Sequence, residues 1–279
     1  MIAQIRTLLY RVVRSKSTWI LLIAPALILT LGFLLRLFEI SMAGYENAII
    51  PFYPAEYVIL LFFASAVFTH IIVSTEKSDG GWRNKISIGV KRIYIYMASW
   101  IVSALFALLS TSLFVLTDYI LRTIWGNSHT KNYIAPGNKF IVLTLVWVLA
   151  FSALYTLINV YFSMKIFGLV VSLVAFWGVI GIGSLCQARL DEPYKKYFVN
   201  EETGLEEYEE NPYYVTGNVR KALVYISERV PIVYNDMTDN TSNRKISKHV
   251  DKIQKETAIV FLLTSTVIGI VSFERKEIT

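Results

Sequence analysis

Cysteine and histidine are scarce in this chain. Its 279 residues include one cysteine, Cys186, and three histidines, His70, His129 and His249. A single cysteine excludes an intramolecular disulfide and a cysteine-based zinc framework. The histidines fall on separate segments, on both sides of the membrane in the topology derived below, so a shared metal site or a His-centred triad is not expected. We therefore predict that the chain has no catalytic residue and binds no metal.

Nucleotide-binding loops are absent as well. No segment matches the pattern G-x-x-x-x-G-K-[ST], so the chain does not bind ATP in that way. Gly178, Gly181 and Gly183 lie close together, but inside an apolar run rather than after a strand. This placement favours close helix packing, or a local break in the helix, over a ligand loop.

Long apolar runs are what the sequence does contain. Hydrophobic residues make up 54% of the chain and charged residues 17%. A bilayer core of about 30 Å requires about twenty apolar residues in a helix, and these runs do not alternate as barrel strands do. The sequence therefore predicts an all-α, polytopic membrane protein, with the first five of six spans in residues 17–186. The predicted spans are Trp19–Phe38, Tyr57–Val73, Tyr94–Leu116, Phe140–Phe162, Ile166–Cys186 and Thr257–Phe273.

The charges outside these spans predict the orientation of the chain. Lys and Arg in short loops are retained on the cytoplasmic side, and an inside N-terminus places twelve of them in the cytoplasm against four outside. The chain is then expected in the plasma membrane, with both termini in the cytoplasm. The net charge of +6 is thus a topology signal, and we expect no nucleic-acid partner. Because the spans contain almost no ionisable residue, the energy for any uphill transport should enter from the cytoplasm.

The segment 1–16 has the pattern of an amphipathic helix. One side of the helical wheel carries polar residues, including Arg11 and Arg14. We predict an interfacial helix along the inner leaflet, with its basic face towards membrane lipids or a cytoplasmic partner. A simple anchor for the first span is the alternative. The apolar side consists of Ile2, Ile5, Leu8, Leu9, Val12 and Val13.

The loop 75–92, between the second and third spans, is suited to contact a cytoplasmic partner. Glu76 is a charged residue at the point where the chain leaves the membrane, and the Gly80–Gly81 pair allows a sharp turn. Trp82 offers an anchor that Arg83 and Lys85 flank. An ordinary boundary loop with positive-inside residues is the alternative interpretation.

Two segments at the predicted inner ends of the spans, the loop residues 76–92 and the residues from Phe273 onward, carry patterns that resemble those of ABC-2-type transporter permeases. In that family the second span commonly runs into E-x-x-x-G, and a G-V-x-R segment opens the third span. Many members also end in F-x-R-[RK]-[DE]-I after the sixth span, which Phe273–Ile278 matches. The N-terminal helix, the six spans and the long fifth outer loop extend the likeness over nearly the whole chain. The matching loop residues are Glu76 and Gly80, then Gly89, Val90 and Arg92.

The resemblance implies a permease subunit of an ATP-driven transporter. Such a subunit would pair with a second permease subunit, of the same or a different chain, and with a dimer of cytoplasmic ABC ATPases. ATP and Mg²⁺ would bind to the ATPase, and this chain itself would hold no cofactor. The inner loop and the N-terminal helix would rest in a cleft of the ATPase. The implied coupling residues are Glu76, Lys77, Gly80, Gly81, Trp82, Arg83, Arg92, Arg11 and Arg14.

The resemblance also implies that the second and fifth spans face the transport pathway. Without interior charge, the expected cargo is a hydrophobic or amphipathic peptide, a lipid-like molecule or a drug. Bacterial relatives commonly export peptides or remove antimicrobial peptides from the membrane. Aromatic side chains on these spans are candidates for substrate contact, although such residues also face lipid or neighbouring helices. They are Phe62, Phe63, Phe68, Phe176 and Trp177.

Residues 187–256 form the longest polar stretch and are predicted to be an extracellular subdomain, followed by the last span and tail in 257–279. An acidic cluster that ends at Asn211–Pro212 predicts a solvated hairpin or loop, with a cation or peptide site as the alternative. Val219–Val230 has apolar residues at helical spacing, which predicts a short helix stopped by Pro231. The acidic cluster is Glu201, Glu202, Glu206, Glu207, Glu209 and Glu210.

Two other classes of protein remain open. A non-transporting receptor or assembly factor would bind a ligand through its outer segment and recruit a cytoplasmic protein through the inner loop. An intramembrane enzyme would require polar residues at comparable depth on neighbouring spans, which the sequence does not reveal. The requirement for an ATPase, and solute movement on nucleotide hydrolysis, separate the transporter from the receptor.

Overall fold

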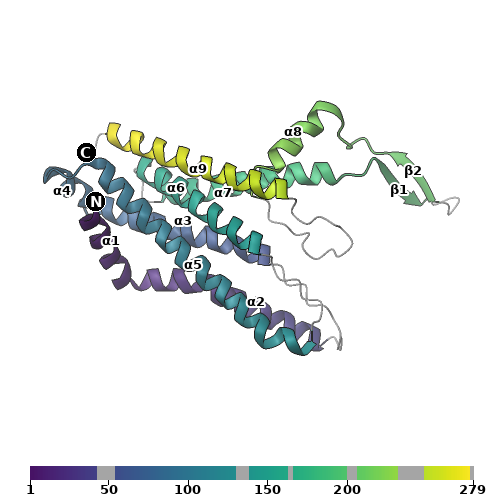
Figure 1. Ribbon diagram of the computed structural model, residues 1–279, viewed down its shortest axis with the longest axis horizontal. Helices are drawn as coiled ribbons and strands as arrows, with labels where there is room; N and C mark the ends of the chain where they lie inside the picture. The colour runs from purple at the N-terminus through teal and green to yellow at the C-terminus, as the bar shows by residue number, and fades with distance from the viewer. Residues whose placement is uncertain (43–53, 130–137, 163–165, 200–205, 232–247, 277–279) are drawn as a thin grey trace.

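The computed structural model describes residues 1–42, 54–129, 138–162, 166–199, 206–231 and 248–276. Six helices in these residues are long and apolar enough to cross a membrane, which confirms the predicted number of spans and identifies an integral membrane protein. They lie side by side in one bundle (Figure 1). These helices are α2 (Lys16–Met42), α3 (Pro54–Ser78), α5 (Arg92–His129), α6 (Asn138–Tyr161), α7 (Phe167–Asp191) and α9 (Lys248–Arg275).

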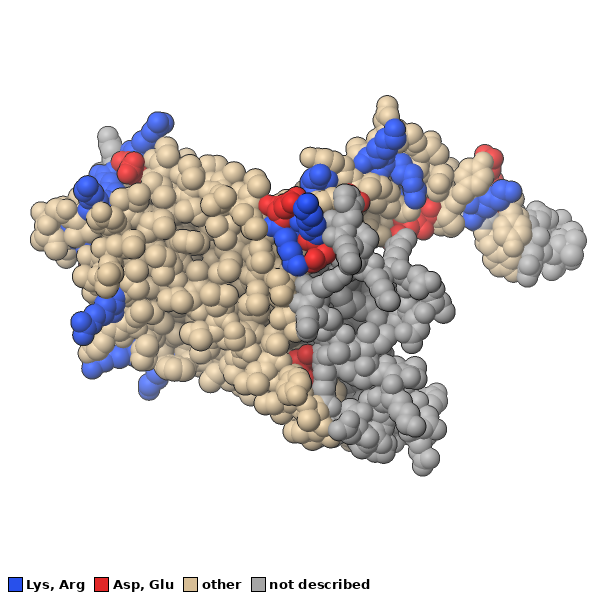
Figure 2. Space-filling view, in the orientation of Figure 1, with Lys and Arg blue, Asp and Glu red and all other residues tan. Residues whose placement is uncertain are grey.

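The charged side chains support this placement in a membrane. Figure 2 shows Lys, Arg, Asp and Glu at the two ends of the bundle, with an uncharged surface between them. One end holds the N-terminus, α4 (Gly81–Ser87) and the end of α9, and is called the α4 end below. The opposite end holds α8 (Gly217–Ser227) and is called the α8 end.

Two helices extend well past the apolar runs that predicted them. α5 has 38 residues and continues beyond Leu116 to His129. α9 begins at Lys248, before the predicted start at Thr257. Its polar first turns are compatible with a helix because Lys255 pairs with Asp251 at 2.8 Å, one turn apart. Hydropathy located the membrane segments, whereas helix ends depend on local pairing as well.

α6 is the central helix of the bundle and packs against α3, α5, α7 and α9. Its Phe151 is fully buried. The ring centroid of Phe151 lies 5.2 Å from Phe62 of α3, 5.5 Å from Phe176 of α7 and 5.8 Å from Phe261 of α9. These edge-on and tilted contacts are the arrangements that aromatic rings favour, and they join four spans in one aromatic core.

The N-terminal segment forms helix α1 (Ile2–Arg14), as predicted. Leu8 is buried against Phe68 and Phe106, with Ile5, Leu9 and Val12 packed around it. Ile2 and Val13, which share that side of the helical wheel, are 80% and 59% exposed in this single chain. Helix α1 packs mainly against α5, and an interfacial helix leaves such apolar side chains to the membrane lipids.

In the described residues the fold is all-helical, as predicted, apart from a small hairpin at the α8 end. Strands β1 (Lys195–Val199) and β2 (Glu206–Glu210) pair antiparallel, with Lys195 opposite Glu210 and Lys196 opposite Glu209. The acidic cluster thus contributes a strand to a hairpin, as one of the two interpretations expected, and Glu201 and Glu202 lie outside the described residues. The opposed charges offset the low strand propensity of a Glu-rich segment.

The predicted short helix after the hairpin is confirmed as α8, which packs against α7. After it, Val230 lies where a side chain at Gly183 would be, since a Cβ there would meet its Cγ1 at 2.8 Å. Close packing is therefore confirmed for Gly183. It is not found at Gly178 or Gly181, where a Cβ would meet nothing within 4 Å of the described structure.

Candidate functional site

The α4 end begins with a sharp turn between α3 and α4, built on two glycines. Gly80 has a φ of +67°, a left-handed conformation that residues with a Cβ rarely adopt. A Cβ on Gly81 would lie 2.9 Å from the carbonyl oxygen of Glu76. The predicted role of the glycine pair is therefore confirmed, and the turn sets α4 against the end of α3.

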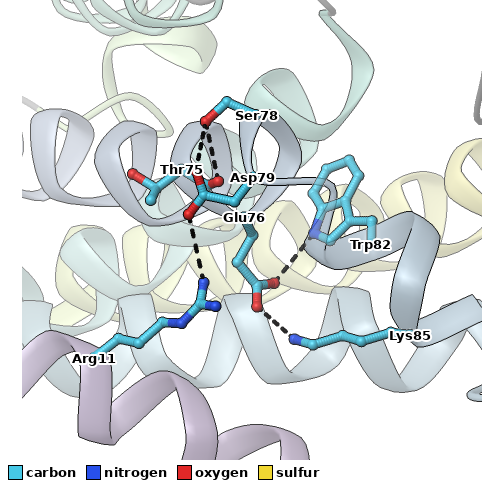
Figure 3. A network of polar contacts seen from close by, with 7 residues as sticks. All are labelled: Arg11, Thr75, Glu76, Ser78, Asp79, Trp82 and Lys85. Carbon is cyan, nitrogen blue, oxygen red and sulfur yellow. Dashed lines mark hydrogen bonds and ion pairs between the residues drawn. The ribbon is translucent and has the colours of Figure 1, made fainter.

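Glu76 is turned into the protein rather than towards solvent. Its side chain is buried, with 1% of the residue exposed. The carboxylate forms an ion pair with Lys85 and accepts a hydrogen bond of 3.2 Å from the indole N–H of Trp82 (Figure 3). A buried carboxylate needs such partners, because removal from water is costly without them. Glu76 therefore fastens α4 to α3, and the idea of a charge presented at the membrane edge is wrong.

Trp82 packs inside its own chain rather than against a partner protein. It is 2% exposed, and its ring packs edge-on against Phe273 of α9 at 4.9 Å between centroids. Val73, Tyr96 and Val160 belong to the same buried cluster. The loop thus packs against several spans at once, and the indole is not free for a partner protein.

Arg92 joins the same arrangement from the start of α5. Its guanidinium donates hydrogen bonds to the carbonyl oxygens of Phe273, at 3.5 Å, Glu274, at 2.9 Å, and Lys276. These carbonyls belong to the end of α9, where the helix leaves acceptors unpaired and carries partial negative charge. The two sequence patterns, one in residues 76–92 and one starting at Phe273, therefore contact each other directly.

Two lysines hold the end of α6 in the same region. The ammonium of Lys77 donates to the carbonyl of Phe162 at 2.9 Å. Lys276 donates to the carbonyls of Val160 and Tyr161 at 2.8 and 2.6 Å. Burial lowers the pKa of Lys276 from its ordinary value of 10.5. Lys77, predicted as a contact for an ATPase, thus connects α3 to α6.

The predicted basic residues of α1 have different surroundings. Arg11 lies 4.0 Å from Asp79, but both side chains are about half exposed, so the pair contributes little stability. Arg14 lies over the ring of Tyr10, 4.3 Å from its centroid. Arg83 of α4 is exposed. Of the predicted coupling residues, Arg11, Arg14 and Arg83 are accessible at the surface.

One exposed residue of the loop escaped the sequence reasoning. Ile88 caps the end of α4 and is 78% exposed, although it is apolar. Gly89, with a φ of +86°, follows it and directs the chain back to α5. Asn84, Ser87 and Lys91 are exposed around it. The available signal was an apolar residue between Ser87 and Gly89, directly before the glycine that ends the short helix.

Comparisons with known proteins do not identify the chain. No family model, no curated protein and no solved structure matches it. The interpretation of the site therefore rests on the residues and contacts described here.

The five aromatic residues predicted to contact substrate divide into two groups. Phe62, Phe68 and Phe176 are at most 4% exposed and pack inside this single chain. Phe68, for example, stacks on Phe106 at 3.6 Å between centroids. Phe63 and Trp177 are instead 46% and 54% exposed, on α3 and α7. Only these two are available to a molecule outside the bundle in this conformation.

The structure also reveals polar residues at one depth on three neighbouring spans, which sequence reasoning missed. The Asn159 amide donates to the carbonyl of Tyr155 at 2.8 Å and to the hydroxyl of Ser172 at 3.2 Å. Its oxygen lies 2.7 Å from Nδ1 of His70, which must therefore be the donor. The hydroxyl of Ser172 donates to the Gly168 carbonyl at 2.7 Å. His70 does not contact that hydroxyl, so the group lacks an activated nucleophile.

The described residues hold no group of three or more His, Cys, Asp or Glu side chains that could bind a metal ion. Cys186 is buried. The arrangement at the α4 end can therefore position a short helix and connect it to several spans, while no catalytic chemistry is evident in the part of the chain that the structure describes.

Proposed function

We propose that the chain is a permease subunit of an ATP-driven transporter of the ABC-2 type, with the α4 end in the cytoplasm. The observation that carries the proposal is the contact between the two patterns on which the resemblance rests. Arg92 of the loop hydrogen-bonds to the end of α9, and Trp82 packs against Phe273. Residues far apart in the sequence are thereby packed together at one end of the spans.

The contact surface for the ATPase differs from the residues that the family patterns emphasise. Glu76, Trp82 and Arg92 hold α4 in place from inside the chain. The surface offered to a partner consists of exposed side chains, chiefly Arg83, Ile88 and Lys91. An exposed apolar residue flanked by cations fits a cleft with an apolar floor and an acidic rim.

Movement of α4 would pass to the spans through its fixed contacts. The Glu76–Lys85 pair connects α4 to α3, and Trp82 connects it to α9. Lys77 and Lys276 extend the connection to α6. Closure of an ATPase dimer against α4 would thus displace three spans together. In this account ATP and Mg²⁺ bind to the ATPase, and a second permease subunit completes the pathway.

The proposed cargo is a hydrophobic or amphipathic molecule, such as a peptide, a lipid-like compound or a drug. On the face that Figure 2 shows, the surface between the two ends of the bundle is uncharged, which favours apolar contacts. Phe63 and Trp177 are the exposed aromatic candidates for these contacts. Export of a peptide, including an antimicrobial peptide, belongs to this class of function.

A receptor or assembly factor is the second candidate, and the hairpin at the α8 end supports it. Tyr197 and Tyr208 face each other across the strands at 5.9 Å between centroids and are 53% and 64% exposed. Exposed tyrosines are common in binding surfaces for proteins. In this alternative the hairpin would bind a ligand, and α4 would recruit a protein that does not hydrolyse ATP.

Purification of the tagged full chain together with its neighbouring gene products tests the proposal. We expect a stoichiometric ATPase in mild detergent, and we expect Ile88→Asp to remove it while the chain still folds. Lys252→Asp is the matched control, because Lys252 is exposed at the α8 end. Recovery of the chain without an ATPase, or of an ATPase that Ile88→Asp leaves bound, would favour the receptor.

A further inference from the structure

Lys77 and Lys276 place two positive charges on a single helix end. Both ammonium groups donate to the last carbonyls of α6, those of Val160, Tyr161 and Phe162. These three carbonyls belong to consecutive residues, so the two ammonium groups share one small region of the surface. A helix end supplies only about half a negative charge, so more than one positive charge remains uncompensated there.

Carboxylates do not supply the missing charge among the described residues. The ion pairs found there involve Glu76, Asp79, Asp251 and Glu256, and none of these carboxylates pairs with Lys77 or Lys276. Arg92 nearby is bonded to carbonyls as well. Three cations therefore gather there on backbone carbonyls, with the Trp82 ring 5.7 Å from the Lys77 ammonium as a further partner. Each ammonium group has three N–H donors, so Lys77 and Lys276 can also donate to a phosphate.

The surface next to the two lysines is apolar and exposed. Tyr161, the last residue of α6, is 61% exposed, and Ile166 and Phe167 at the start of α7 are 73% and 47% exposed. The ring of Phe162 bridges Tyr161 and Phe167 at 5.3 and 4.9 Å between centroids. An aromatic and apolar surface beside cations matches the boundary between lipid headgroups and acyl chains.

We propose that Lys77 and Lys276 bind the phosphate of an anionic phospholipid, whose acyl chains lie along Tyr161, Ile166 and Phe167. The phosphate oxygens accept hydrogen bonds from the two ammonium groups and neutralise their charge. The lipid then bridges α3, α6 and the end of α9 at the base of α4. The adjacent apolar surface favours a lipid over free phosphate. This site does not depend on the proposed transport function.

Binding of defined lipids to the purified full chain tests the proposal. The delipidated protein is titrated with dioleoyl phosphatidylglycerol or dioleoyl phosphatidylcholine, and bound lipids are counted by native mass spectrometry. We expect one phosphatidylglycerol molecule to bind more tightly than phosphatidylcholine. Lys77→Gln with Lys276→Gln should weaken this binding by about thirtyfold, because each lost positive charge should weaken it by roughly fivefold. Arg83→Gln with Lys91→Gln removes equal charge from the same end and should change it less than twofold.

A charge-preserving variant separates binding from folding. Lys77→Arg with Lys276→Arg keeps both charges and should retain phosphatidylglycerol, even if the glutamine variant fails to fold. Equal binding of the two lipids by the native chain, or equal losses in the glutamine and control variants, would overturn the site. Displacement of the lipid by millimolar inorganic phosphate would overturn the assignment to a phospholipid and indicate a free phosphate instead.

Discussion

Trp82 packs edge-on against Phe273 with 4.9 Å between ring centroids, and this contact joins the loop after α3 to the end of α9. Both residues are at most 2% exposed. The contact gives the α4 end a defined geometry, since α4 is a short helix of seven residues that would have little stability alone. Its position therefore depends on residues from distant parts of the chain.

Phe273→Ala tests this dependence. The substitution removes the ring beneath Trp82 and should destabilise the protein by about 3 kcal/mol, the usual range for loss of a buried Phe. Thermal unfolding in detergent measures the change. Val271→Ala on the same helix is the control, because Val271 is 41% exposed. An equal effect of both substitutions would argue against a defined Trp82–Phe273 contact.

The buried pair of Glu76 and Lys85 should behave as a unit. Lys85→Met leaves the Glu76 carboxylate buried without its counter-ion and should cost about 3 kcal/mol. Glu76→Gln combined with Lys85→Met removes both charges and should recover most of that loss. Arg83→Met, at an exposed position of the same helix, should have little effect. Chemical unfolding of the four proteins provides the comparison, and a double variant no more stable than Lys85→Met would contradict the pairing.

The contacts around the glycines predict which of them tolerate a larger side chain. Gly269 of α9 lies against Tyr96, whose hydroxyl oxygen would be 2.0 Å from a Cβ at that position. Gly269→Ala should therefore destabilise the protein by about 2 kcal/mol through overpacking, and Tyr96→Leu should partly relieve the loss. Gly178→Ala is the matched control, because a Cβ there meets nothing within 4 Å. In thermal unfolding, Gly178→Ala should have an unfolding temperature close to that of the native chain.

Lys276 should make stability depend on pH in a zwitterionic detergent without anionic lipid. Its pKa in the folded state is lowered below 10.5, so the unfolded state binds more protons at pH values between the two. Stability from this group therefore rises as pH increases through that window. The difference in unfolding temperature between the native chain and Lys276→Gln should change in that direction. A difference that does not vary with pH would contradict the burial of the ammonium.

The sequence predicted the features that depend on local composition. The six spans, the turn at Gly80–Gly81 and helix α8 follow from hydropathy, glycine placement and apolar spacing. The orientation of Glu76 did not, because a charged residue at the end of a span is compatible with either direction. Its partner Lys85 was read as a flank of Trp82, and only tertiary structure brings the three together.

Contacts between distant segments could not be predicted from the sequence for the same reason. Arg92 and the end of α9 meet only after the bundle has formed. The His70–Asn159 contact likewise requires α3 and α6 to pack at a particular register. For the acidic cluster the sequence left a hairpin or loop open beside a cation or peptide site. Glu has low strand propensity, and the lysines opposite Glu209 and Glu210 become neighbours only when the two strands pair.

Site-specific photocrosslinking from position 88 in cells tests the central claim most directly. A photoreactive residue in place of Ile88 should crosslink to one protein, and that protein should carry an ATP-binding P-loop. The same residue in place of Lys252, exposed at the α8 end, should not. Crosslinks from position 88 to lipid alone, or to a partner without ATPase activity, would contradict the permease account.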